Sequence, residues 1–591
     1  MSPLGRLTQT WILCFVIQVV SAALYRNPIL PGFHPDPSCT RVDDTYFCAT
    51  SSFNAFPAIP VFASKDLRNF RQIGNVITRP AQLPGLGITN GSTSGMWAPS
   101  IRYHQGTFWI VSTLVFDHLA ANDSSRWDNV LFHTTNPFDS DSWSEAVHFT
   151  FEGYDASPFW DNQGRSYIVA SHAWHVRPAI QGFEMDFSTG VIIGEIRDMW
   201  SGTGGIAPEA PHLIFQDEYY YLMIAEGGTG LNHMVTYARS RNLWGPYEPD
   251  PSNPVLTNSN TTEYFQTVGH ADLFSDPEGN FGQSDSLISS WSRWAVALAT
   301  RSGPDYIYFP MGRETVLTTA QWERGQFPTF TPVRGQEQGP LPRSNKDVGT
   351  FGYWVGSDDH LAFSPGSQLP SHYVHNRFPD ASSYHISPNL HPNTLQLKPS
   401  VLNLTGPDGR TASTPQTFVG RRQEHVEFNF QVTLDFRSNQ AEAEAGVTVF
   451  LNQNQHFDLG LVTLSPESAL REGYTGALNG NITHFMRLRS ITKNSTNDGA
   501  SDPISRPAII PVSQELLSHL ELRVEAVNRT AYAFRYKNGT DWVTVGWGDS
   551  GEISGGFVGT LVGLFATGNG NEVLDMAYFS SLSYEGNDSV F

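Results

Sequence analysis

The sequence of 591 residues contains little positive charge and, beyond its first residues, no long apolar stretch. Lysine and arginine total 36 against 57 acidic residues, and the net charge of −21 argues against nucleic acid and an anionic membrane surface as partners. No later stretch approaches the roughly 18 apolar residues that predict a membrane-spanning helix. Long helical periodicity is also absent, which argues against a fold built from amphipathic helices.

Cysteine is scarce as well, with three in the whole chain. Cys14 lies in an apolar leader, which leaves Cys39 and Cys48 on either side of the turn RVDDTY. A hairpin centred between Asp43 and Asp44 would place these two cysteines directly opposite each other, where a cross-strand disulfide can form in an oxidising compartment. The alternative is a pair of buried free thiols.

The N-terminal residues 1–23 have the pattern of a secretory signal peptide. One basic residue, Arg6, precedes the apolar run WILCFVIQVV, and the small residues SAA follow it. The mature protein is therefore expected to be soluble, secreted and extracellular, with an oligomeric state that the sequence does not indicate. A glycosylated surface is also expected, because nine N-x-S/T sequons occur. They begin at Asn90, Asn122, Asn260, Asn403, Asn481, Asn494, Asn528, Asn538 and Asn587.

The sequence is rich in aromatic, strand-like segments separated by turns of Gly, Asp and Asn. Five of these segments follow a short polar motif: HPDPSC, MWAPSI, YDASPF, APEAPH and VGHADL. The matching positions are Asp36, Ala98, Asp155, Glu209 and His270, at intervals of 62, 57, 54 and 61 residues. Five units of about 60 residues, each with several short strands, predict a five-bladed β-propeller.

A propeller would bring the five motif positions together, because the innermost strands of its blades line one central channel. Three of the positions are carboxylates, at Asp36, Asp155 and Glu209. Their convergence favours a catalytic site. The alternative is that they form hydrogen bonds between neighbouring blades.

The repeat ends near residue 325, and a second β domain follows. The segment 333–347, with its Gly, Pro and polar residues, is predicted to link a propeller at 24–332 to a domain at 348–591. Alternating runs such as VEFNFQVTLDF and HLELRVEAV predict an antiparallel sandwich there. The chain is therefore expected to be all-β, with a five-bladed β-propeller followed by a C-terminal antiparallel β-sandwich.

Three converging carboxylates suit the hydrolysis of a glycosidic bond. One carboxyl must be protonated and donate to the leaving oxygen, while another must be ionised and activate water or attack directly. The third can raise the pKa of the acid by like-charge repulsion. A propeller channel leaves room for a water between acid and base, which favours inversion of configuration.

Seven strings resemble, in order, those of glycoside hydrolase family 43, in particular its two-domain β-xylosidases and α-L-arabinofuranosidases. They are NPILPGFHPDPS, SGMWAPSIRYHQGTFWIV, YDASPFWDNQGRSYIV, PEAPHLI, YYYLMIAEGGTG, GHADL and MGRET. The resemblance spans the propeller and continues more weakly to SGGFVGTLVGLFATG. It implies that Asp36 is the general base, Glu209 the general acid, and Asp155 the carboxylate that tunes and orients the acid, in an inverting enzyme.

The resemblance also implies which residues bind the sugar. Arg313 matches a residue that hydrogen-bonds the terminal sugar, while Phe56 and Trp97 match rings that wall the pocket. Phe557, in SGGFVG, matches an aromatic with which the sandwich closes the pocket; an independent sugar-binding module is the alternative for that domain. His270 matches a histidine on the channel axis that in some relatives ligates calcium, or a water beside it. No cofactor is expected to be required, and a Ca²⁺ ion near His270 is the one metal considered.

The implied activity is that of an exo-acting β-1,4-xylosidase, which releases xylose from the non-reducing ends of xylo-oligosaccharides. An α-L-arabinofuranosidase that debranches arabinoxylan, or an enzyme with both activities, is the alternative, and a non-catalytic sugar-binding propeller is a remote one. Two departures from the family pattern bear on the substrate more than on the chemistry. Ala210 stands where the two-domain β-xylosidases usually have glycine, and the segment 282–303 differs from the usual form of that loop.

Overall fold

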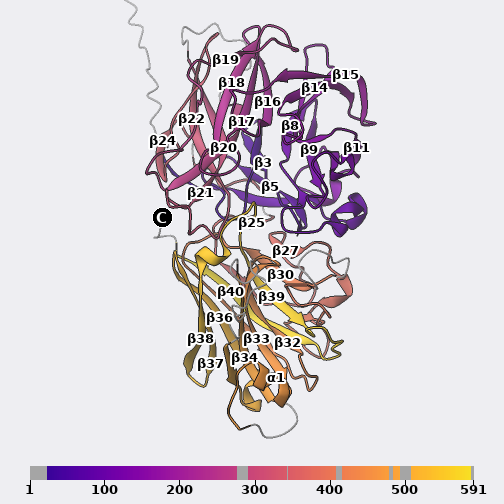
Figure 1. Cartoon of the computed structure of the whole chain (residues 1–591), viewed down its shortest axis with the longest axis vertical. Coiled ribbons are helices and arrows are strands. Elements are labelled where there is room, and N and C mark those ends of the chain that lie inside the picture. The colour runs from indigo at the N-terminus through magenta and orange to yellow at the C-terminus, as the bar shows by residue number, and fades with distance from the viewer. Residues whose placement is uncertain are drawn as a thin grey trace, which may run out of the picture.

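The computed structural model describes residues 23–275, 290–342, 344–349, 351–406, 415–477, 483–492 and 508–587. These residues form β-strands almost throughout, with one α-helix, α1 (Pro466–Arg471). Figure 1 shows two bodies stacked along the long axis, with propeller strands in indigo to rose and sandwich strands mainly in orange to yellow. No helix within the described ranges is long and apolar enough to cross a membrane. The signal peptide predicted at 1–23 lies, apart from Ala23, outside the described residues.

Five antiparallel sheets form the blades of the upper body and confirm the predicted five-bladed propeller. The first blade contains β2 (Ser38–Val42), β3 (Thr45–Ala49), β5 (Ala58–Ser64), β6 (Arg71–Ile77) and β25 (Tyr353–Trp354). The second contains β7 (Gly95–Met96), β8 (Ser100–His104), β9 (Thr107–Val115), β10 (Trp127–Thr134) and β11 (Val147–Phe149). The third contains β12 (Gly153–Trp160), β13 (Ser166–His172), β14 (Ile180–Asp186) and β15 (Val191–Trp200). The fourth contains β16 (Glu209–Gln216), β17 (Tyr219–Glu226), β18 (Met234–Ser240) and β19 (Glu248–Pro249). The fifth contains β20 (Phe265–Ser275), β21 (Ser290–Arg301), β22 (Glu314–Glu323) and β23 (Thr329–Phe330).

The strands β2, β8, β12, β16 and β20 pack against one another around the channel, and the motif positions lie on them or just before them. Asp155 and His270 lie within β12 and β20, and Glu209 begins β16. The pairing of these three strands with the next strand shifts register close to each motif position. Such β-bulges re-aim individual side chains, so the three motif residues are positioned by local irregularities of otherwise regular strands.

The lower body is a sandwich of two antiparallel sheets, which confirms the second part of the predicted fold. One sheet contains β28 (Tyr384–Ile386), β29 (Leu395–Leu397), β40 (Ala577–Gly586), β31 (Phe428–Asp435), β36 (Leu520–Asn528), β37 (Ala531–Asn538) and β38 (Asp541–Asp549), with β26 (Asp359–Leu361) beside β40. The other contains β35 (Ala508–Pro511), β34 (Thr483–Ile491), β33 (Gln455–Leu464), β32 (Glu444–Asn452), β39 (Leu561–Thr567), β30 (Thr417–Arg422), β27 (Tyr373–Asn376) and β4 (Ala55–Phe56).

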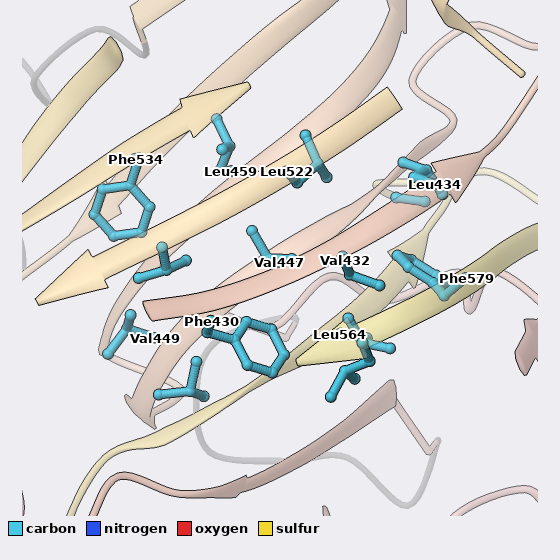
Figure 2. Close-up of a cluster of buried hydrophobic side chains, with 14 of the residues drawn as sticks. Phe430, Val432, Leu434, Val447, Val449, Leu459, Leu522, Phe534, Leu564 and Phe579 are labelled. Carbon is cyan, nitrogen blue, oxygen red and sulfur yellow. The ribbon is translucent and has the colours of Figure 1, made fainter. Parts of the chain in front are cut away.

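The core of the sandwich lies between its two sheets (Figure 2). Phe430, Val432 and Leu434 occupy alternate positions of β31, so all three point to the same face, where they share a buried cluster with Val447 and Val449 of β32. Burying one such side chain stabilises the fold by about 1.5–3 kcal/mol. The sandwich therefore has a well-packed core of its own, and it contributes the loop with Phe557 to the propeller.

Short strands form pairs across the predicted domain boundaries. The segment 333–347, predicted as a linker, contains β24 (Gln336–Gly339), which pairs with β1 (Ala23–Arg26). The strand β25 lies in the segment assigned to the sandwich, yet it pairs with β6 of the first blade. The strand β27 pairs with β30 and also with β4, which lies in the propeller segment. Strands of two to four residues have no periodic pattern of their own, so the sequence did not indicate them.

Cys39 and Cys48 form a disulfide across the hairpin of β2 and β3. The two residues are directly paired in the register of these strands, and their Cα atoms are 4.1 Å apart. The turn between the strands is centred on Asp43 and Asp44. The bond links two strands of the blade that carries Asp36, two residues before β2.

Candidate active site

The motif positions of the propeller meet in one small pocket. The pocket takes residues from all five blades and one residue from the sandwich. Its lining consists of Asp36, Phe53, Trp97, Ala98, Tyr154, Asp155, Glu209, Thr229, His270, Arg313 and Phe557. Of the residues predicted for a site, only Phe56 is missing from this lining.

Asp36 is a buried carboxylate with a hydrogen bond to each oxygen. The hydroxyl of Ser51 donates to Oδ2 at 2.6 Å, and Nη1 of Arg313 donates to Oδ1 at 2.8 Å. Burial raises the pKa of Asp36, but the charges of Arg313 and His270 and the Ser51 hydrogen bond together outweigh burial, so the net pKa lies below its ordinary value. Asp36 is therefore ionised at neutral pH.

Glu209 is in the opposite electrostatic situation. Burial and the negative charge of Asp36 raise the pKa of Glu209 to about 7, although Arg313 and a hydrogen bond from Tyr154 oppose the rise. The Tyr154 hydroxyl donates to Oε2 at 3.2 Å, and Nε2 of His233 lies 3.8 Å from Oε1. Burial also lowers the pKa of His233 to about 3, so this imidazole is neutral and does not stabilise the ionised form of Glu209 as a cation would.

Asp155 is tied to the strand that carries Glu209. The backbone N–H of Ala210, the residue after Glu209, donates to Oδ2 of Asp155 at 3.2 Å, and Nδ1 of His270 lies 3.9 Å from the same oxygen. Burial, followed by the charges of Glu209 and Asp36, raises the pKa of Asp155 well above its ordinary value. The pocket thus contains one carboxylate that holds its negative charge and two carboxyls that favour protonation.

The backbone at the pocket is strained in a repeated way. The φ angle is 54° at Asp36, 53° at Asp155, 53° at Ala210 and 47° at His270. Residues other than glycine rarely adopt this left-handed region, and where they do, the surrounding structure must hold them there. Such positions concentrate at functional sites, and three of the four, Asp155, Ala210 and His270, coincide with register shifts of the channel strands.

Three aromatic rings from two domains wall the pocket. The ring centroids of Phe53, Trp97 and Phe557 lie 6.0 to 6.2 Å apart from one another. The guanidinium of Arg313 lies 5.6 Å from the centroid of Phe53 and 5.3 Å from that of Phe557, and its Nε donates to the Phe557 carbonyl at 3.2 Å. The sandwich residue Phe557 therefore contacts both the wall and the cation of the propeller site.

The expectation that Phe56 walls the pocket is wrong. Phe56 lies in β4 opposite His375 of β27, and its ring packs edge-on against Phe378 in the hydrophobic core, with the centroids 4.8 Å apart. Phe53, three residues earlier in SSFNAFPA, faces the pocket instead. A bridge between Phe53 and Met96 of the next blade fixes this choice, and the local sequence contains no sign of that long-range contact.

Four polar neighbours of the site were not indicated by the sequence pattern. They are Ser51, Tyr154, Thr229 and His233. Thr229 accepts a hydrogen bond from Nη1 of Arg313 at 3.2 Å. A signal was present for two of them, because Tyr154 directly precedes Asp155 in YDASP and Thr229 belongs to the string EGGTG.

The surroundings of His270 do not provide a calcium cage. Its Nδ1 lies 3.6 Å from Oδ1 of Asp36, which also accepts from Arg313. Across the described ranges, no group of three or more His, Cys, Asp or Glu residues is arranged to hold a metal ion. Calcium takes six to eight oxygen ligands, so side chains alone do not fit this ion here.

Comparison with known proteins agrees with the fold. Residues 25–328 match the model of glycosyl hydrolases family 43, and residues 362–585 match that of the β-xylosidase C-terminal concanavalin A-like domain. The chain is 31% identical to a non-reducing end α-L-arabinofuranosidase, BoGH43B, of Bacteroides ovatus, with 94% of this chain and 93% of the relative covered.

Two further relatives cover nearly the whole chain. A xylosidase/arabinosidase of Butyrivibrio fibrisolvens is 29% identical, over 94% of this chain and 98% of its own length. The crystal structure of a xylan β-1,4-xylosidase from Bacillus halodurans superposes with a TM-score of 0.78 at 25% identity, over 95% of this chain and 100% of that one.

Proposed function

The chain belongs to family 43 of the glycosyl hydrolases and is a glycosidase, and from this premise we propose that it is an exo-acting β-1,4-xylosidase. It would release xylose from the non-reducing ends of xylo-oligosaccharides. The observation that carries the proposal is the pairing, in one pocket, of a carboxylate with a lowered pKa and a carboxyl with a raised pKa. Hydrolysis of a glycosidic bond needs one group of each kind.

In the proposed mechanism the two groups act on opposite sides of the scissile bond. Asp36 accepts a proton from a water molecule while the oxygen of that water bonds to the anomeric carbon. Glu209 donates its proton to the glycosidic oxygen as the bond from the anomeric carbon breaks, so the products are a sugar of inverted configuration and a shortened chain. Asp155 accepts a hydrogen bond from the N–H of Ala210 and so orients the strand of the acid.

The pocket wall favours action on a chain end. Phe557 of the sandwich and Phe53 of the propeller meet over Arg313, to which the resemblance assigns a hydrogen bond to the terminal sugar. A pocket walled on this side suits a single terminal residue better than the middle of a polymer.

An α-L-arabinofuranosidase activity is the second candidate, alone or beside the xylosidase. The relatives described above carry both names, one of them in combination. Terminal xylose and terminal arabinofuranose can present similar hydroxyl groups to the same pocket. For the present chain we take xylo-oligosaccharides as the main substrate and arabinoxylan side chains as the secondary one.

We further propose that catalysis needs no cofactor, and that any calcium near His270 would bind mainly through water. The protein is proposed to be exported and glycosylated, on the basis of the leader at 1–23 and the nine sequons. Its acidic character supports a neutral glycan, rather than nucleic acid or a membrane surface, as the partner.

Rates on four substrates test the activity: p-nitrophenyl β-D-xyloside, p-nitrophenyl α-L-arabinofuranoside, xylobiose and arabinoxylan. We expect fast cleavage of xylobiose. Release of arabinose from the polymer with xylobiose left intact would instead establish the debranching enzyme.

The assignment of the acid is tested separately with Glu209→Gln. This variant should lose far more activity on xylobiose than on an activated aryl xyloside, because only the poor leaving group needs the proton. Asp36→Asn should lose activity on both substrates alike. Equal losses on both substrates for Glu209→Gln would remove it from the role of acid.

A further inference from the structure

Five polar side chains, one from each blade, lie further along the channel strands than the pocket residues. Each lies two to four residues after a motif position, which is about 7–13 Å further along an extended strand. They are Ser38 of β2, Arg102 of β8, Ser157 of β12, His212 of β16 and Asp272 of β20. Four of them are at most 2% exposed, and the side chain of Arg102 is 20% exposed. We call this group the axial ring.

Asp272 is the centre of the axial ring. Arg102 donates from Nη1 to Oδ2 at 2.7 Å and from Nη2 to Oδ1 at 2.8 Å, which is a bidentate ion pair. The hydroxyl of Ser38 donates to Oδ2 at 2.6 Å, and the backbone N–H of Cys39 donates to the same oxygen at 3.1 Å. One carboxylate of the fifth blade thus binds the first and second blades together.

The remaining two blades join through His212. Its Nδ1 lies 2.9 Å from Nη2 of Arg102 and 3.1 Å from the hydroxyl of Ser157. Burial lowers the pKa of His212 to about 3, so the imidazole is neutral and Nδ1 can accept from the guanidinium. The axial ring is therefore continuous across all five blades.

The position of the axial ring relates it to the reaction. Ser38 follows Asp36 by two residues, Ser157 follows Asp155 by two, and His212 follows Glu209 by three. Ser38 and His212 bond directly to the Arg102–Asp272 pair, and Ser157 reaches it through His212. The strands next to all three catalytic carboxyls are therefore tied to the same pair. A shift of one strand along the channel would have to break a buried hydrogen bond of the ring.

We propose that Asp272 and Arg102 are positioning residues of the glycosidase reaction, because their ion pair holds the strands of Asp36, Asp155 and Glu209 in a common register. This inference rests on the proposed function. The pair also has an electrostatic consequence. Because the charges of Asp272 and Arg102 cancel, the pKa of Glu209 is set by its own neighbours. Those neighbours are Asp36, Asp155, Arg313, Tyr154 and His233.

The test compares kcat, KM and the pH dependence of kcat/KM for Asp272→Asn and Arg102→Met in the full chain. Misplaced carboxyls should lower kcat about 10- to 100-fold, with KM changed less than about threefold. Asp272→Asn leaves an unpaired cation and should move the alkaline limit of activity down by about 0.5 pH unit, whereas Arg102→Met leaves an anion and should move it up. Shifts of opposite sign would show that the charges of the pair act on Glu209, and the fall in kcat at a nearly unchanged KM tests the positioning itself.

Two further variants keep the test decisive if either single variant folds poorly. Arg102→Lys keeps the charge but loses the bidentate geometry, so kcat should fall while the alkaline limit stays in place. Glu444→Gln breaks a buried ion pair with Arg487 in the sandwich and serves as the matched control. It should lower the melting temperature and leave both kcat and the pH profile unchanged.

Retention of kcat within about twofold in the folded Arg102 and Asp272 variants would overturn the proposal, as would shifts of the same sign. These outcomes differ from a failure of the proposed function, which would appear as absence of xylosidase and arabinofuranosidase activity in the unmodified protein. All variants are compared on whichever sugar the unmodified protein hydrolyses.

Discussion

At the scale of single residues, the site shows how environment gives one chemical group two roles. Asp36 is buried and Glu209 is largely buried, with 15% of its side chain exposed, and burial alone would raise the pKa of each. Asp36 has Arg313 and Ser51 in direct contact, whereas Glu209 has only the neutral Tyr154 and His233. The position of one guanidinium therefore decides which carboxyl is base and which is acid.

The pH dependence of kcat/KM should follow from these shifts. The raised pKa of Glu209 keeps it protonated up to about pH 7, so activity should fall as pH rises through about 7. The lowered pKa of Asp36 keeps it ionised, so activity should fall on the acid side only below the ordinary range of aspartate. A profile on xylobiose between about pH 3 and 9 measures both limits.

Tyr154→Phe is the control for the alkaline limit. The substitution removes the Tyr154 hydroxyl, whose hydrogen bond lowers the pKa of Glu209, so the alkaline limit should move to higher pH. An alkaline limit near the ordinary pKa of a glutamate, or no shift in Tyr154→Phe, would contradict the assignment.

Ala210 should be a point of stored strain. Its φ of 53° lies in the region that favours glycine, and the left-handed conformation costs an L-residue about 1–2 kcal/mol. We expect Ala210→Gly to stabilise the protein by about 1 kcal/mol, because the backbone N–H can still donate to Asp155. Thermal melting measures the effect. Ala156→Gly is the matched control, since Ala156 is buried beside Asp155 without a positive φ, and it should destabilise.

At the scale of elements, the segment from Ser554 to Thr560 attaches the sandwich to the active site. Ser554 accepts a hydrogen bond at its hydroxyl from the backbone N–H of Phe309, at 3.0 Å, and Thr560 donates from its backbone to the carbonyl of Pro310, at 2.8 Å. These contacts flank Phe557 on both sides. The segment is therefore fixed to the chain just before Arg313.

Gly559→Ala should displace this segment. An added Cβ would lie 2.1 Å from the carbonyl oxygen of Met311 and 3.0 Å from Cβ of Phe33, so the backbone must move. Phe557, two residues before Gly559, contacts Arg313. We therefore expect KM for xylobiose to rise about tenfold, with a smaller change in kcat. Gly230→Ala is the control, since its Cβ would meet nothing within 4 Å. Equal KM values for the two variants would show that the wall does not bind substrate.

Elements also mark the limit of what the sequence could predict. The five channel strands were predictable because each follows a polar motif at nearly constant spacing, and the three catalytic carboxyls belong to those motifs. Phe53 and Phe56 could not be distinguished, because their facing depends on pairings with Met96 and His375, far away in sequence. The axial ring was equally hidden, since a lone Arg102 or Asp272 carries no pattern until the blades close.

At the scale of the whole molecule, the two domains share sheets rather than merely touching. The strand β25 completes the first blade, and β27 joins the second sheet of the sandwich to β4. Buried arginines reinforce the boundary. Arg422 donates from Nε to the carbonyl of Phe33 at 2.8 Å, and Arg301 donates from Nη2 to the carbonyl of Glu424 at 3.1 Å. Separating the two domains would break these strand pairs and expose the buried arginines.

We therefore expect the chain to unfold in a single cooperative transition despite its two domains. Glu444→Gln tests this cooperativity, because Glu444 lies in the sandwich, remote from the pocket. The substitution leaves Arg487 buried without its main partner, which should lower the free energy of unfolding by about 3–5 kcal/mol. If the two domains unfold together, this substitution should lower the calorimetric melting temperature and the temperature at which activity is lost by the same amount. Two separate transitions, with the propeller retaining activity above the melting of the sandwich, would show instead that the shared strands hold the domains together only weakly.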